Sequence, residues 1–357
     1  MQNSNKKDNI LILTQRVDIN DDVLGFMHGW IAEFAKRCEK VTVICLKLGE
    51  FNFPSNVKVL SLGKEGGESK IKYLVNFYKY IWQERKNYDI VFAHMNYEYI
   101  LLGGIIWRLL GKKIGLWYAH GKVRFELKIA EILADEVFTS TTSGFRLPSK
   151  KLHVVGQGID TDKFQLSNQY KNPDLFSLIT VGRISPVKGY DVVLSAINII
   201  KNKIGNFKLT IIGAPVMTEH VEYLGRLKNK VRELNLTNQV EFIGALPNDK
   251  IIPYLQQADL MINASSTGSL DKVMPEAMAT GLPIVTCNVA IKAVIKEDWQ
   301  RYFFTAGDID QLAEKILFYY DLKQSNQISE LAKKLREIVI KDHDLKNLVT
   351  KILDLYI

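Results

Sequence analysis

The chain of 357 residues is long enough for two domains, since soluble domains usually hold about 100–200 residues. Its apolar fraction of 47% and its charged fraction of 24% are typical of a globular protein, and they exclude a disordered, collagenous or coiled-coil chain. No apolar run reaches the length of about 18 residues that a membrane-spanning helix needs. The polar residues 1–9 lack the pattern of a signal peptide.

The cysteine content and the net charge limit the compartment and the partners that we expect. Cys38, Cys45 and Cys287 fit neither a disulfide framework nor a metal motif, so we expect buried thiols in a cytoplasmic protein. The 47 Lys and Arg exceed the 39 Asp and Glu, which gives a net charge of +8. A basic excess of this size is compatible with an anionic ligand, an anionic membrane surface or nucleic acid.

Part of the positive charge is concentrated in residues 104–128. This stretch has a net charge of +5, and four aromatic residues are interleaved with its cations. The cations are Arg108, Lys112, Lys113, Lys122, Arg124 and Lys128. Two interpretations stay open: a solvated basic face, or peripheral docking on the anionic inner face of the cell membrane. We expect no nucleic-acid partner.

Short apolar runs alternate with helical patterns along most of the chain. The expected strands are 9–13, 41–46, 57–60, 90–94, 114–119, 136–139 and 152–155, followed by 177–181, 208–212, 240–243, 260–263 and 283–287. Many of these runs are continuously apolar, as in parallel strands that are buried on both faces. The alternation predicts right-handed βαβ units and therefore an α/β fold of doubly wound parallel sheets.

Apolar residues recur at helical spacing in several of the intervening segments. One set is Leu24, Met27, Trp30, Ile31 and Phe34, and a second is Ile71, Leu74, Val75, Tyr78 and Trp82. Such a stripe is typical of a helix that packs one face on the core. The stretch from Gln327 onward is helical by the same pattern.

The polar gap 160–174 predicts a linker between two domains. We therefore expect a Rossmann-like domain over 1–165, a second over 175–335, and a helical segment over 336–357 that could pack back on the first domain. Two such halves with a central cleft between them place a ligand at the carboxyl ends of their strands.

The segment 178–194 carries the sharpest local pattern. An apolar strand ends at Val181, and the loop that follows holds Gly182, Arg183 and Lys188 before a helix begins. A helix N-terminus presents free N–H groups and a partial positive charge. Together with the two cations, it predicts an anion site suited to a diphosphate.

A second motif covers residues 259–285. A strand leads into a small polar loop, and a short helix with Pro275 in its first turn follows. The carboxylate of Glu276 in this helix can accept two hydrogen bonds from a vicinal diol such as a ribose. Alternatively, Glu276 is present because the helix dipole favours an acid in the first turn.

The two motifs, together with Gly-Ile-Asp at 158–160, Phe-Ile-Gly at 242–244 and Glu-Ala-Met-Ala-Thr-Gly-Leu-Pro at 276–283, occur in the order of a known family. The chain resembles the family 4 glycosyltransferases, which are retaining enzymes with the GT-B fold. The resemblance covers residues 10–320 and is strongest over 150–290. It implies an acceptor-side first domain and a second domain that binds the nucleotide sugar, with Arg183 and Lys188 on the donor diphosphate and Glu276 on the donor ribose.

The sequence departs from the family at one position. The family usually has two glutamates eight positions apart, and the residue eight positions before Glu276 is Gly268. Asp271, Lys272 and the backbone N–H groups of the loop Gly268, Ser269 and Leu270 are therefore candidates for contact with the donor sugar.

Three segments of the first half follow expected strands. His120 precedes Gly121 at a strand end, where the resemblance implies a contact with the donor sugar. Gly25 resembles the glycine loop that closes over the phosphates. The nearby acidic cluster Asp18, Asp21 and Asp22 is a candidate for contact with the acceptor; alternatively, Asp21 or Asp22 caps the following helix. His94, at another strand end, is a candidate for the acceptor pocket.

Other chemistries lack their motifs. The sequence has no GxGxxG after the first strand, no GxxxxGK[ST] and no HExxH, and no Asp-x-Asp triplet of the type that holds a metal–nucleotide complex in the other large glycosyltransferase fold, so we expect no cofactor and no metal. The predicted function is a retaining, metal-independent glycosyltransferase that moves a sugar from a UDP-sugar or GDP-sugar to a lipid-linked, glycan or small-molecule acceptor. A GT-B sugar-nucleotide epimerase, a phosphorylase and a weakly active or non-catalytic sugar-nucleotide-binding protein stay open as alternatives.

Overall fold

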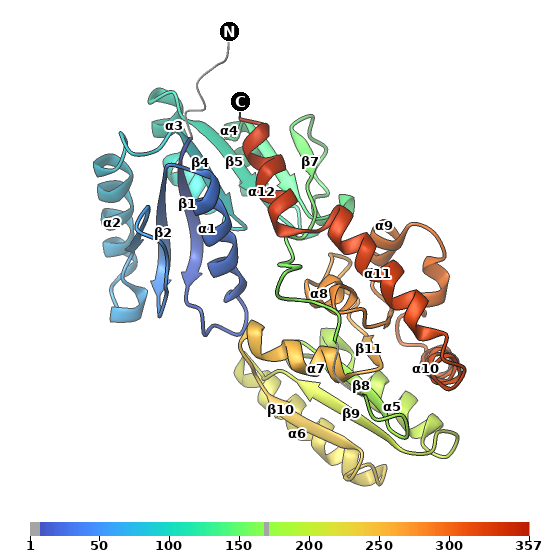
Figure 1. Ribbon diagram of the computed structural model, residues 1–357. Coiled ribbons are helices and arrows are strands. Elements are labelled where there is room, and N and C mark those ends of the chain that lie inside the picture. The colour runs from blue at the N-terminus through green and yellow to red at the C-terminus, as the bar shows by residue number, and fades with distance from the viewer. Residues whose placement is uncertain (1–7, 168–170, 357) are drawn as a thin grey trace. The chain divides into compact units, whose positions relative to one another are not determined.

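The computed structural model describes residues 8–167 and 171–356, and it divides the chain into two compact units (Figure 1). Unit 1 extends to Gly158 and resumes at Leu345, whereas unit 2 is Ile159–Asp344. The chain therefore passes from one unit to the other twice, after Gly158 and after Asp344.

The first crossing lies ahead of the expected linker. Much of the linker packs on unit 2, where Phe164 is buried in the core and Thr161 Oγ1 donates to Asp344 Oδ2 at 2.6 Å. Arg336 binds the same stretch by donating to the carbonyl oxygen of Phe164 at 2.6 Å. The boundary is thus 158/159 instead of 165, because these contacts attach residues 159–167 to unit 2. Residues 168–170 of the expected linker lie outside the described residues.

Unit 1 contains one parallel sheet with the strand order β3-β2-β1-β4-β5-β6-β7. Its strands are β1 (Asn9–Val17), β2 (Lys40–Leu48), β3 (Val57–Ser61), β4 (Ile90–His94), β5 (Lys113–Trp117), β6 (Glu136–Thr139) and β7 (Leu152–Val154). Its helices are α1 (Phe26–Arg37), α2 (Lys70–Gln83), α3 (Glu98–Leu109), α4 (Phe125–Leu133) and α12 (Leu345–Asp354).

Helices cover both faces of this sheet. Side chains of α1 and α12 share one buried cluster with it, and side chains of α2, α3 and α4 share the cluster on the other face. The last helix, α12, lies beside α1 (Figure 1). The C-terminal segment expected over 336–357 is therefore divided, because 336–342 belong to α11 in unit 2 and, of the described residues, only 345–356 belong to unit 1.

The apolar stripe of α2 differs from expectation. Ile71, Leu74, Val75, Tyr78 and Trp82 are 40–75% exposed, whereas Phe77 and Ile81, on the adjoining face of the helix, are buried. Helix α2 is apolar over most of its circumference, so the spacing alone did not reveal which side meets the sheet. By contrast, Met27, Trp30, Ile31 and Phe34 of α1 are buried as expected.

Unit 2 contains a second parallel sheet, with the strand order β10-β9-β8-β11-β12. Its strands are β8 (Phe176–Val181), β9 (Phe207–Ile212), β10 (Val240–Gly244), β11 (Leu260–Asn263) and β12 (Ile284–Thr286). Its helices are α5 (Tyr190–Ile200), α6 (Thr218–Glu233), α7 (Ile252–Gln257), α8 (Val273–Ala279), α9 (Ile291–Ile295), α10 (Ile309–Gln324) and α11 (Ile328–Asp342). Each expected strand coincides with a strand of the two sheets, so the predicted doubly wound α/β architecture is confirmed.

Candidate active site

The two motifs of unit 2 meet at the point where its strand order reverses. In the order β10-β9-β8-β11-β12, the connections from β8 and from β11 run to opposite sides of the sheet. Doubly wound sheets bind ligands at the carboxyl ends of the strands that flank such a reversal. Arg183 and Lys188 follow β8, and Asp271 and Lys272 follow β11. The topology therefore brings both sets of polar residues to the same edge of one sheet.

The loop between β8 and α5 passes close to the end of β9. Gly182 N–H donates to the carbonyl oxygen of Ile212 at 2.9 Å, and a Cβ atom on Gly213 would overlap the carbonyl oxygen of Gly182. Gly213 also has a φ of +148°, which L-residues rarely adopt. Gly182 and Gly213 thus let the β8–α5 loop pass close to the end of β9. The neighbouring side chain of Arg183 is exposed and has no ion-pair or hydrogen-bond partner in the described part of the chain.

Lys188 is held by a residue of the β11–α8 loop. Its Nζ lies 2.9 Å from Asp271 Oδ2, and the two side chains are only 14% and 16% exposed. Asn263 Nδ2, at the end of β11, donates to the same oxygen at 3.0 Å. Asp271 therefore orients the ammonium group of Lys188, which keeps further N–H donors for a ligand.

Glu276 is buried in α8 and bonded on one oxygen. Its Oε1 accepts from Lys272 Nζ and from Asn248 Nδ2, each at 2.9 Å, and the side chain is 3% exposed. Because both donors bind Oε1, Oε2 is the oxygen that keeps acceptor capacity toward a ligand. Lys272, a candidate for sugar contact, pairs with Glu276.

The Gly268, Ser269 and Leu270 loop is tied down by residues that the sequence did not single out. Gly268 has a φ of +74°, and Leu270 is buried. Asn288 Nδ2 donates to the carbonyl oxygen of Ser269 at 2.7 Å. Asn248, Asn263 and Asn288 come from three different segments, so no local spacing in the sequence indicates that they meet this site.

In unit 1, Gly25 and the acidic cluster form the start of α1. Asp21 Oδ1 accepts from the N–H groups of Val23 and Leu24 at 3.0 and 2.6 Å, and its carboxylate pairs with Arg16. A Cβ atom on Gly25 would lie 2.5 Å from the carbonyl oxygen of Asp21, so this turn requires glycine. Asp21 therefore stabilises the turn ahead of α1 and does not cap the helix, because the N-cap residue of α1 is Gly25 and no side chain caps it.

The two histidines of unit 1 differ in environment. His94 is buried and stacks on Trp117 with ring centroids 4.9 Å apart, so it belongs to an aromatic cluster of the core. His120 follows β5, is exposed, and its Nδ1 accepts from Lys122 N–H at 3.1 Å. Partial burial lowers the pKa of His120, and the positive charges of Lys122, Arg146 and Arg124 lower it further.

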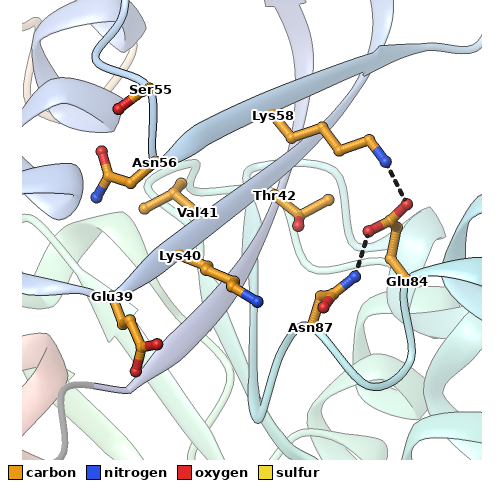
Figure 2. Close-up of a pocket in the computed structure, with 9 residues that line it drawn as sticks. All are labelled: Glu39, Lys40, Val41, Thr42, Ser55, Asn56, Lys58, Glu84 and Asn87. Carbon is orange, nitrogen blue, oxygen red and sulfur yellow. Dashed lines mark hydrogen bonds and ion pairs between the residues drawn. The ribbon is translucent and has the colours of Figure 1, made fainter.

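A separate pocket of about 440 Å³ lies at the amino end of the unit 1 sheet (Figure 2). It is lined by residues that precede or begin β2, β3 and β4, including Lys40, Asn56 and Asn87. Lys58 Nζ lies 2.6 Å from Glu84 Oε1, and Asn87 Nδ2 donates to Glu84 Oε2 at 2.8 Å. Lys58 and Glu84 are therefore engaged with each other, and the pocket contains none of the candidate site residues.

Residues 8–167 and 171–356 contain no group of three or more His, Cys, Asp and Glu side chains placed to hold a metal ion. None of their helices combines the length and the apolar character required to cross a bilayer. Cys38, Cys45 and Cys287 are buried and form no disulfide among the described residues, and burial raises the pKa of Cys45 to about 12 and that of Cys287 to about 11.

Solved structures that are similar to this chain show which class of fold it has. The Anabaena protein Alr3699/HepE in complex with UDP matches with a TM-score of 0.76 and 18% identity over 98% of this chain and 99% of that one. The same protein has been solved with UDP-glucose. Two Rossmann-like parallel-sheet domains of this kind make the fold GT-B.

The family follows from the sequence. Residues 148–342, more than half of the chain, match the family described as "Glycosyl transferases group 1". The chain belongs to that family.

Curated relatives align over a part of their length. Amylovoran biosynthesis glycosyltransferase AmsK of Erwinia amylovora is 29% identical over 48% of this chain and 42% of its own. The GDP-mannose-dependent alpha-(1-6)-phosphatidylinositol monomannoside mannosyltransferase of Mycobacterium tuberculosis is 24% identical over 40% of this chain and 39% of its own. The chain thus spans less than half the length of these two relatives.

Proposed function

We propose that this chain is a retaining glycosyltransferase that transfers a sugar from a nucleoside diphosphate sugar without a metal ion. The observation that carries the proposal is the pairing of Lys188 with Asp271 across the reversal point of the unit 2 sheet, beside the unpartnered Arg183. Two cations at the carboxyl ends of parallel strands fit a diphosphate. The family match over 148–342 supports sugar transfer as the reaction.

Cleavage of the donor creates charge that the site has to stabilise. As the bond between the anomeric carbon and the diphosphate oxygen breaks, positive charge develops on the sugar and negative charge on the leaving diphosphate. Arg183 and Lys188 stabilise that negative charge. The acceptor oxygen bonds to the anomeric carbon, and the leaving phosphate oxygen takes the proton of that hydroxyl. The step therefore needs no protein base, and no protein nucleophile is assigned.

Glu276 is proposed to bind the ribose, with Oε2 accepting from a hydroxyl while Lys272 and Asn248 hold Oε1. Asp271 is assigned to orienting Lys188. The donor sugar then lies against the loop Gly268, Ser269 and Leu270, whose backbone N–H groups take the place of the missing first glutamate. In unit 1, Gly25 is assigned to the glycine loop that closes over the phosphates, and His120 is assigned to contact with the donor sugar, as the family resemblance implies.

A donor panel tests the proposal directly. The names of similar proteins favour UDP-glucose and GDP-mannose as the first two donors, because one was solved with UDP-glucose and another is GDP-mannose-dependent. Thermal unfolding with each donor identifies the base, since a ligand that binds only the folded state raises stability by mass action. NMR of the product shows whether the anomeric configuration is retained. Binding without release of nucleoside diphosphate, with or without acceptors such as polyprenyl-linked sugars, would favour the non-catalytic alternative.

Activity is expected to survive an excess of EDTA. The two cations supply the electrostatic stabilisation that a divalent metal supplies in other nucleotide-sugar enzymes. The measurement is the initial rate of nucleoside diphosphate release after dialysis against EDTA. Complete loss of activity that Mg²⁺ or Mn²⁺ restores would contradict the metal-independent mechanism.

His120 is expected to titrate below the usual histidine pKa of about 6.5. Partial burial and the nearby cations disfavour the imidazolium form, so the ring is neutral at pH 7 and becomes protonated only at a lower pH. Because Nδ1 accepts from Lys122 N–H, the neutral ring carries its proton on Nε2. An NMR titration of the His120 ring measures this pKa. Arg146→Gln should raise it, whereas a pKa at or above the usual value in the wild type would contradict the prediction.

A further inference from the structure

Helix α2 presents an apolar stripe to solvent. Ile71, Leu74, Val75, Tyr78 and Trp82 lie on one helical face, and all five are exposed. A surface helix normally turns such a stripe toward the core, but α2 buries Phe77 and Ile81, on the adjoining face, instead. A contiguous apolar face on the surface of a protein usually marks a site of interaction.

Two neighbouring helices extend this face. Helix α2 joins α3 through Tyr78 Oη, which donates to the carbonyl oxygen of Leu102 at 3.2 Å. Helix α3 joins α4 through Arg108 Nε, which donates to the carbonyl oxygen of Leu133 at 3.0 Å. All three helices cover the same side of the sheet. The exposed apolar residues of the two added helices are Ile105, Leu109, Phe125, Ile129 and Ile132. Together with the stripe of α2, they form what we call the α2–α4 apolar face.

Unpaired positive charge accompanies this face, and it outweighs negative charge on α2, whereas α4 carries the acids Glu126 and Glu131. The exposed side chains of Lys70, Lys72 and Lys86 from the α2 segment, and of Arg124 and Lys128 at the start of α4, make no ion pair or side-chain hydrogen bond with any described residue. Two other cations of the basic stretch are different, because Arg108 caps α4 and Lys112 donates to the carbonyl oxygen of Tyr88.

Negative charge is scarce on α2. Its segment 69–87 contains the single acid Glu84, which is buried and pairs with Lys58. The partner that suits the α2–α4 apolar face therefore combines negative charge with an apolar interior. A second copy of this chain fits poorly, because it would bring the same unpaired lysines together.

We propose that the α2–α4 apolar face docks unit 1 on a bilayer that contains anionic lipid. The aliphatic side chains enter the boundary between headgroups and acyl chains, and the lysines bind lipid phosphates. Trp82 and Tyr78 are residues that favour this boundary. The proposal is independent of the donor site in unit 2, and its test requires no turnover.

Co-sedimentation of the full chain with vesicles tests the proposal. Binding is expected with phosphatidylcholine mixed with phosphatidylglycerol, and not with phosphatidylcholine alone, and it should weaken as salt is added. Ile71→Ser combined with Val75→Ser should abolish binding at an unchanged unfolding temperature. The matched control is Val216→Ser with Val221→Ser, two exposed apolar residues of unit 2, and it should bind as the wild type does.

Two further measurements separate charge from apolar insertion. Neutralising Lys70, Lys72 and Lys86 to Gln should lower the partition coefficient about fivefold per lysine. Trp82 is the exposed tryptophan among those that the structure describes, so its emission should shift to shorter wavelength on mixed vesicles. Trp82→Phe should remove that shift.

Three outcomes would overturn the proposal. The first is no binding to mixed vesicles, and the second is equal binding to both kinds of vesicle. The third is a concentration-dependent dimer that the Ile71 and Val75 substitutions dissociate, which would show that a second copy covers the face.

Discussion

Replacing Arg183 by alanine is expected to lower kcat/KM at least tenfold and to change the free energy of unfolding by no more than about 0.5 kcal/mol. A charge-assisted hydrogen bond to phosphate contributes about 1.5–3 kcal/mol, which corresponds to about tenfold or more in rate. The side chain of Arg183 is exposed and has no partner in the described residues, so its removal breaks no internal contact.

Lys203→Ala is the matched control for this experiment. Lys203 is also an exposed cation of unit 2, and its side chain makes no ion pair or hydrogen bond with the residues that the structure describes. It lies ahead of β9, at the amino edge of the sheet, far along the strands from the candidate site. Full activity in both variants would contradict the diphosphate assignment, and equal losses in both would indicate a general effect of charge.

Lys188→Ala should cost as much activity, but its effect on stability is different. This substitution leaves the mostly buried carboxylate of Asp271 without its ion-pair partner. Lys188→Ala combined with Asp271→Asn removes both charges and should recover much of the lost stability. Activity should remain low in the double variant, because the cation that contacts the diphosphate is still absent.

The strands were predictable because parallel strands buried on both faces leave a strong local signal. Runs such as Ile10-Leu11-Ile12-Leu13 are continuously apolar, and each coincides with an observed strand. The loops that carry Arg183 and Asp271 could be placed as well, since they follow such strands directly. That both loops flank the reversal of strand order depends on the pairing of β8 with β11, which no local pattern contains.

The errors arose where contacts between distant residues decide the structure. The polar stretch after Gly158 resembles a linker, but Thr161 is bonded to Asp344, 183 positions away, and this contact attaches it to unit 2. Helix α2 is apolar over two adjoining faces, and the structure buries the one with Phe77 and Ile81, which the spacing did not indicate. Asn248 reaches Glu276 from another segment, so the sequence alone gave no reason to include it in the site.

Glu276→Gln is expected to remove most of the preference for ribose over 2′-deoxyribose in the bound nucleotide. The wild type should bind the preferred nucleoside diphosphate about tenfold or more tightly than its 2′-deoxy form, because the hydroxyl donates to a buried carboxylate. In the variant an amide replaces the carboxylate, which removes the charge and half of the acceptor capacity. The dissociation constants of the two nucleotides, measured by calorimetry for both proteins, test this expectation.

The ion pair between Glu276 and Lys272 offers a control that separates an effect on nucleotide binding from an effect on folding. Glu276→Gln leaves the ammonium of Lys272, which is 17% exposed, without its carboxylate, and breaking a buried pair costs about 3–5 kcal/mol. Lys272→Met combined with Glu276→Gln removes both charges, so the free energy of unfolding should return toward that of the wild type. If Glu276 binds the ribose, this double variant still binds the ribose and deoxyribose forms alike. If the preference returns together with stability, Glu276 acts only through the fold, and the ribose assignment is wrong.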